Sequence, residues 1–219
     1  MKTWGMILAV AVACLAGCTP SYRVHVNTFA DPNRPVPGGA SVYVVQDPNA
    51  GNPIFGRQIA SKINELLQGY GYSPVDTADR ANYLLTFEAG FNSSQVVDYT
   101  PIYRPFGGFY GGFGGRFHHG GFGYATYVPY VDTVFVHWLR MRLYAKDGTA
   151  LNQANVVWFG EATTGAGSPE LRQAVDYLLI GCMEHFPTDT HKWAAVTLKR
   201  DDPRIQGIAE AVPEEPARR

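Results

Sequence analysis

This 219-residue chain has few cysteines, no excess of positive charge and no apolar stretch long enough to cross a membrane as a helix. Its three cysteines are Cys14, Cys18 and Cys182. The apolar run at 7–16 falls short of the about 20 residues that a membrane-spanning helix needs. Lys and Arg number 18 against 19 Asp and Glu, so no basic stripe is available to contact phosphates, and nucleic-acid binding is not expected.

The apolar run lies at the N-terminus, as it does in a secretion signal. Lys2 supplies the positive start, and Leu15-Ala16-Gly17-Cys18 closes the segment in a way that resembles the lipobox of bacterial lipoproteins. The sequence therefore predicts a signal peptide over 1–17 and a lipidated N-terminus and tether over 18–21. The alternative is an ordinary cleaved signal peptide that happens to contain Cys18.

Lipid on Cys18 would anchor the protein to a membrane through its N-terminus. Because Thr19 rather than Asp follows the cysteine, the resemblance to lipoproteins of Gram-negative bacteria implies the outer membrane, with the protein facing the periplasm. Removal of 1–17 would leave 17 basic against 19 acidic residues. Cys182 would then have no intramolecular partner, and we expect it to be buried and inert.

Apolar periodicity divides the rest of the chain into strands and two helices. Asn52-Pro53 and Ser168-Pro169-Glu170 each combine a capping residue with a proline at the first helical position, and Pro187 ends the second helix. The helices are expected at 55–67 and 171–186, and the strands at 22–27, 41–45, 72–75, 81–91, 133–146 and 156–162.

Two helices with one apolar face each need a sheet to cover. We therefore predict an α+β fold, a two-layer sandwich in which an antiparallel sheet of four to six strands carries the two helices on one face. This single α/β sandwich domain spans 22–200, with a glycine- and aromatic-rich loop at 104–128 between the two long strands. Residues 201–219 show no periodic apolar face, so a disordered tail is predicted there.

Three short stretches in this pattern resemble one known family. They are Ala81-Asn82-Tyr83-Leu84-Leu85-Thr86-Phe87, Val157-Trp158-Phe159-Gly160-Glu161-Ala162 and the helix end Phe186-Pro187. Together they resemble the DUF4136 family of bacterial lipoproteins, whose function is unknown. Asn82 stands where the family usually has Asp. The resemblance implies a small α/β sandwich on a lipid anchor, and it supplies no activity and no catalytic residues.

The segment 106–124 contains nine glycines and seven Phe or Tyr residues. Glycine at this density opposes helix and strand through its backbone entropy, so a mobile loop is expected. Two interpretations stay open: an expanded hairpin tip, or a surface whose exposed aromatics stack on sugars, on other aromatics or on an interface. The candidate binding residues are Phe106, Phe109, Tyr110, Phe113, Phe117, Phe122 and Tyr124.

The sequence holds no recognisable catalytic or cofactor motif. A Gly-x-Ser-x-Gly elbow, a phosphate loop, a dinucleotide fingerprint and a His-Glu-x-x-His pair are all missing. Adjacent His118 and His119 lack the spacing of a formed metal site, and His137 is expected to be a hydrogen-bonded histidine in the core or at its margin. We therefore expect no catalytic residues, no metal and no cofactor.

Three functions are compatible with these features. The first is a non-catalytic, lipid-anchored cell-envelope lipoprotein that binds another envelope protein or a polymer such as a polysaccharide. The second is an accessory lipoprotein of an envelope transport or assembly machine, and the third is a periplasmic hydrolase. The anchor, the compact domain and the aromatic segment favour the first. The hydrolase is favoured only by the periplasmic address and a few ionisable residues near strand ends.

Overall fold

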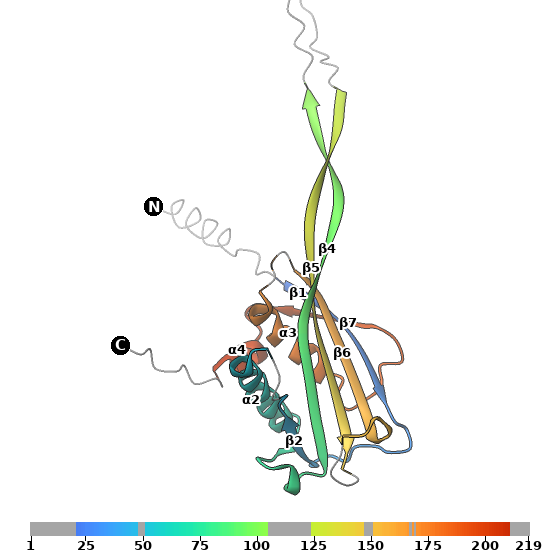
Figure 1. The fold of residues 1–219 in the computed structure, drawn as a ribbon, viewed down its shortest axis with the longest axis vertical. Helices are drawn as coiled ribbons and strands as arrows, with labels where there is room; N and C mark the ends of the chain where they lie inside the picture. Colours follow the sequence, from blue (N-terminus) through green and yellow to red (C-terminus); the bar gives the residue numbers. More distant parts are fainter. Residues whose placement is uncertain are drawn as a thin grey trace, which may run out of the picture.

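A curled sheet forms the body of the molecule, and helices lie against one of its faces (Figure 1). The computed structural model describes residues 21–47, 51–104, 124–146, 151–166, 168 and 170–210. In sheet order, the seven strands of this described part are β3 (Ser73–Pro74), β2 (Ser41–Val45), β4 (Tyr83–Arg104), β5 (Tyr124–Ala145), β6 (Val156–Ala166), β1 (Ser21–Ala30) and β7 (Ala194–Lys199). Its helices are α2 (Pro53–Gly69), α3 (Leu171–Met183) and α4 (Pro203–Glu210), with short 3-10 turns at Ala78–Arg80 and Gln153–Asn155.

The sheet is mixed, so the predicted two-layer sandwich with an antiparallel sheet of four to six strands is wrong. β2 pairs in parallel with both β3 and β4, whereas the other neighbouring strands are antiparallel. The physical reason is that α2 carries the chain from β2 to β3 as a crossover, which returns the chain in the same direction. The prediction also lacks β7, a short edge strand with only Val196 and Leu198 buried.

The core lies between one face of the sheet and the helices. Leu139, Met141 and Leu143, which alternate along β5, are fully buried there, and Ile63 of α2 is equally buried. Asn52 caps α2 as predicted, because its side chain accepts a hydrogen bond from Phe55 N at 3.0 Å. An ion pair of 2.6 Å between Lys62 Nζ and Asp176 Oδ1 links α2 to α3.

The chain after residue 201 does not all lie in a tail. α4 places Ile205 and Ile208 in the core, so the predicted disorder over 201–219 is wrong for 203–210. Two apolar residues three positions apart make a pattern too short to distinguish from chance, which is why the sequence did not indicate this helix. Residues 211–219 lie outside the described part.

The two longest strands extend far beyond the body. β4 and β5 stay in register as far as the pair Arg104 and Tyr124, so the predicted strands 81–91 and 133–146 are too short and the predicted loop 104–128 is wrong for 124–128. We call residues 91–104 and 124–136 the arm. Figure 1 shows the arm leaving the body as a twisted two-stranded ribbon. At about 3.3 Å per residue it measures about 40 Å.

Candidate functional site

Most of the residues that the sequence marks as candidates lie outside the described part of the chain. These are the lipidation site Cys18, the histidines His118 and His119, and the binding-loop residues Phe106, Phe109, Tyr110, Phe113, Phe117 and Phe122. Tyr124, the last member of that set, begins β5. Cys182 is fully buried, and burial raises the pKa of its thiol to about 12. The expected burial of Cys182 is confirmed, and the raised pKa disfavours the reactive thiolate.

The arm is the first candidate site, because its large side chains are exposed and no described residue covers them. Val97 and Tyr99 of β4 are 55% and 58% exposed, and Tyr127 and Val131 of β5 are 63% and 61% exposed. These residues share one face, since Val97 lies opposite Val131 and Tyr99 lies opposite Pro129. The same face becomes the core-facing side of the sheet further along β5, at Leu139, Met141 and Leu143.

The two faces of the arm differ in charge. The face just described holds Phe91, Ser93, Gln95, Val97, Tyr99, Tyr127, Pro129, Val131, Thr133 and Phe135, and we call it the uncharged arm face. The opposite face carries Asp98 and Asp132. There the Tyr130 hydroxyl donates a hydrogen bond of 3.1 Å to Asp98 Oδ2, and this bond raises the pKa of Tyr130.

Beyond Phe135, which still pairs with β6, the outer edges of the arm lack strand partners within the described residues. β2 follows β4 only as far as Thr86, and β6 follows β5 only as far as Phe135. An isolated two-stranded ribbon is marginally stable in water, and an open edge presents unpaired backbone groups. The sequence does hold a signal for this extension, since β-branched and tyrosine residues continue along 96–103 and 127–134.

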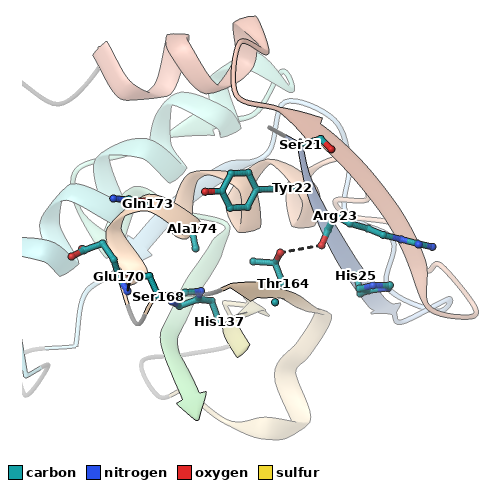
Figure 2. A pocket seen from close by; sticks show the side chains of 11 residues that line it. Ser21, Tyr22, Arg23, His25, His137, Thr164, Ser168, Glu170, Gln173 and Ala174 are labelled. Atoms are coloured by element: carbon teal, nitrogen blue, oxygen red, sulfur yellow. Dashed lines mark hydrogen bonds between the residues drawn. The ribbon is translucent and has the colours of Figure 1, made fainter. Parts of the chain in front are cut away.

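A cavity of about 520 Å³ at the junction of β1, β5, β6 and α3 is the second candidate site (Figure 2). His137, at its floor, is 1% exposed, and neither ring nitrogen has a hydrogen-bond partner among the described residues. The expected burial of His137 is thus correct, whereas the expected hydrogen bond is not observed. Arg23, His25 and Glu170 are also among the residues that line the cavity.

The hydroxyls around this cavity do not form a catalytic pair with His137. Thr164 Oγ1 donates to Arg23 O at 3.0 Å, and Ser168 Oγ accepts from Glu170 N at 3.2 Å. A nucleophile activated by histidine needs a hydrogen bond between the two groups, and none occurs here among the described residues. The cavity can therefore hold a small polar molecule near an imidazole, but its geometry does not prepare a nucleophile.

The outward face of the sheet carries charged side chains that pair across neighbouring strands. Arg140 pairs with Glu161 at 2.9 Å, and Arg142 pairs with Glu88 at 2.8 Å. The Arg140 guanidinium also lies 5.1 Å from the Trp138 ring centroid. Each of these exposed ion pairs contributes about 0–1 kcal/mol to the free energy of unfolding, so together they add little to the stability of the fold.

Two further features bear on function. No helix in the described ranges is long and apolar enough to span a membrane. Across the same ranges, no three His, Cys, Asp or Glu side chains come together in a way that suits a metal ion.

Comparisons with known proteins give a family and distant structural neighbours. The model of a family described as "Domain of unknown function (DUF4136)" matches residues 22–188. A PDZ domain protein from Parabacteroides distasonis is 14% identical, with a TM-score of 0.49, and the match covers 87% of this chain and 42% of that one. This chain thus spans less than half of that protein.

A second neighbour is the PelC dodecamer from Paraburkholderia phytofirmans. Two structures of it are 16% identical, with TM-scores of 0.39 and 0.38, over 73% of this chain and 94% of that one. No curated protein matches the chain.

Proposed function

The chain belongs to the DUF4136 family, and from that starting point we propose that it is a non-catalytic, lipid-anchored lipoprotein of the cell envelope that binds another envelope protein or a polymer through its arm. The exposed arm is the observation that carries this proposal. Burial of a hydrophobic core requires the inner parts of β4 and β5 only, where Leu85 and Leu143 are fully buried. The outer part therefore serves something outside the domain.

The form of the arm favours binding. It presents large side chains such as Tyr99 and Tyr127 without a covering layer. Tyrosine combines a broad apolar ring with a hydroxyl and loses little side-chain entropy on binding, which makes it frequent in contact surfaces. The register of β4 and β5 ends at the pair Arg104 and Tyr124. The glycine- and aromatic-rich sequence 105–123 connects these two residues along the chain.

The proposed anchor is Cys18 in the outer membrane, with the domain in the periplasm. β1 starts at Ser21, so the tether between lipid and domain is only a few residues long. Each buried CH₂ of an acyl chain contributes about 0.8 kcal/mol, and two or three chains together hold a protein at a membrane. Thr19 after the cysteine supports the outer rather than the inner membrane.

The cavity beside His137 supports the non-catalytic part of the proposal. A hydrolase would need a prepared nucleophile or an activated water, and neither Thr164 nor Ser168 forms a hydrogen bond with the imidazole.

Two experiments test the proposal. Labelling of growing cells with a fatty-acid analogue should mark the wild-type protein and leave Cys18→Ala unmarked; equal labelling of both would refute the anchor. Crosslinking in intact envelopes should then capture a stoichiometric partner with the wild-type chain. The same capture by a variant that lacks arm residues 95–133 would show that another surface binds it. A partner that belongs to a transport or assembly machine would identify the protein as an accessory lipoprotein.

A further inference from the structure

The uncharged arm face is unusual for a surface in water. From Phe91 to Tyr99 and from Tyr127 to Phe135, every charged side chain points to the opposite face. Its distal end groups Val97, Tyr99, Tyr127 and Val131, each more than half exposed. The residues lie on adjacent register pairs, so they form one continuous patch despite the twist of the ribbon.

This patch lies on the side of the domain from which the tether starts. In the sheet register, His25 of β1 lies opposite Thr163 of β6. Thr163 in turn lies opposite Trp138 of β5. Because β1 runs antiparallel to β6, Ser21 lies at the same end of the sheet as the pair Phe135 and Ala166, where the arm leaves the body. Cys18 is three residues before Ser21, which restricts it to about 10 Å from Ser21. β1 lies two strand spacings, about 10 Å, from β5, so Cys18 lies within about 20 Å of the base of the arm.

We propose that the uncharged arm face lies on the bilayer that holds the Cys18 lipid, with its apolar side chains at the level of the headgroups. The inference rests on the proposed anchor and names a lipid surface as one occupant of the arm. A surface within about 20 Å of the base of the arm lies within reach of the arm, which is about 40 Å long.

The contact is interfacial rather than membrane-spanning. Among the described residues, no strand pairs with either edge of the outer arm, and unpaired backbone groups do not enter hydrocarbon. Tyr99 and Tyr127 are the residue type that is enriched where lipid meets water.

Charge supports this orientation. Asp98 and Asp132 lie on the opposite face, where they stay in water and away from phosphate headgroups. That face, with Tyr130, then remains open to a protein or polymer partner. A weak lipid contact suffices, because a short tether raises the local concentration of the arm at the membrane to about the millimolar range.

Two neighbouring valines provide a matched test. Val97 belongs to the uncharged arm face and Val96 to the opposite face, and both are exposed. Val97→Cys and Val96→Cys would each carry an environment-sensitive fluorophore in the full lipidated protein, reconstituted into phosphatidylethanolamine and phosphatidylglycerol vesicles. Cys182 is fully buried and does not compete for the label.

A nitroxide quencher on the lipid chains should quench the Val97 probe at least threefold more than the Val96 probe, and aqueous iodide should show the reverse order. Equal quenching of the two probes by either agent would overturn the inference. If the protein floats with the vesicles and neither probe is quenched from the lipid side, the anchor stands and the lipid contact is refuted. If the wild-type protein does not float, the proposed anchor fails and the inference falls with it.

A second copy of the chain is the competing occupant. The unlipidated Cys18→Ala protein carrying the Val97 probe, without vesicles, distinguishes the two. Sedimentation as a monomer with a Val97 probe open to iodide supports the lipid surface. Sedimentation as an oligomer with the Val97 probe protected would assign this face to contacts between copies and overturn the inference.

Discussion

The inner and outer parts of the same two strands show what an alternating sequence determines and what it leaves open. In the inner part, Leu85 and Leu139 share a face that the helices cover, and both are fully buried. In the outer part, Val97 and Val131 continue that face and are 55% and 61% exposed. Alternation therefore fixes which side chains share a face, and the helices decide whether that face becomes a core.

The opposite faces of the two parts differ as well. In the body, Arg140 and Arg142 pair across the strands with Glu161 and Glu88. In the arm, the corresponding face holds carboxylates and the hydrogen bond from Tyr130 to Asp98. The body thus has balanced charge on its outer face, whereas the arm has acidic charge on one face and none on the other. Such a division suits a segment that meets two different surroundings.

The largest loss of stability is expected from Ile63→Asp, at the centre of the body. Ile63 is fully buried, so the variant would place an unpaired carboxylate in the core, at several kcal/mol out of a total stability of about 5–15 kcal/mol. Thermal denaturation followed by circular dichroism should show partial or complete unfolding. Ser61→Asp, at an exposed position of the same helix, should leave the melting temperature within a few degrees. A stable Ile63→Asp protein would mean that the helix face is not a core face.

A smaller loss of stability is expected from Gly160→Ala in β6. A methyl group at this position would overlap the Trp158 ring and lie 2.6 Å from Cys182 Sγ, and both side chains are buried. Overpacking of this kind costs about 1–3 kcal/mol. Gly165→Ala, on the same strand, meets nothing within 4 Å and should change the free energy of unfolding by much less. Equal values for the two variants in urea titrations would contradict this packing.

An effect of about 1 kcal/mol is expected from Asp202→Ala at the start of α4. Asp202 Oδ1 accepts from Arg204 N at 3.0 Å, and Oδ2 pairs with the Arg204 guanidinium at 2.9 Å. The hydrogen bond from Arg204 holds the pKa of Asp202 below its usual value. Its stabilisation is therefore present above about pH 4 and is lost as the pH falls through the lowered pKa.

The measurement for Asp202 is the difference in unfolding free energy between wild type and variant at two pH values. The difference should be full at pH 7 and should shrink toward pH 2. Asp201→Ala provides the control, since the neighbouring carboxylate is exposed. A free-energy difference that grows on acidification would contradict the stabilising role of the ionised Asp202 carboxylate at the start of α4.

The sequence indicates individual elements better than their connections. The start of α2 follows from Asn52 and Pro53, and the core-facing residues of β5 follow from their period of two. The parallel pairing of β2 with β4 depends on a long-range crossover, which no local pattern encodes. Among the side chains that the structure describes, β7 and α4 each contribute two buried apolar residues, which is too few for a periodic signal.

The candidate site was predicted less completely than the fold. The aromatic residues at 106–122 are the most prominent candidates in the sequence, yet they lie outside the described part of the chain. The exposed surface that the structure describes belongs to β4 and β5, the two strands that flank them in the sequence. Val97 and Tyr99 form a strand pattern, but a pattern of this length does not tell whether its apolar face is buried or bare. The cavity around His137 could not be found, because it brings together β1, β5, β6 and α3 from distant parts of the chain.

The smallest effect on stability is expected from removal of the arm, and it tests the comparison most directly. Ser94 and Val134 lie opposite each other in the register, so an Asn-Gly turn can join them in place of 95–133. The removed side chains that the structure describes are exposed, so the free energy of unfolding should change by less than about 1 kcal/mol. The matched control places the same turn between Glu88 and Arg140, which removes the buried Leu139 and should unfold the body. Urea denaturation compares the two shortened proteins with wild type. If the first shortening destabilises the body as much as the second, the arm is part of the core, and the division between a covered and an uncovered half of one hairpin is refuted.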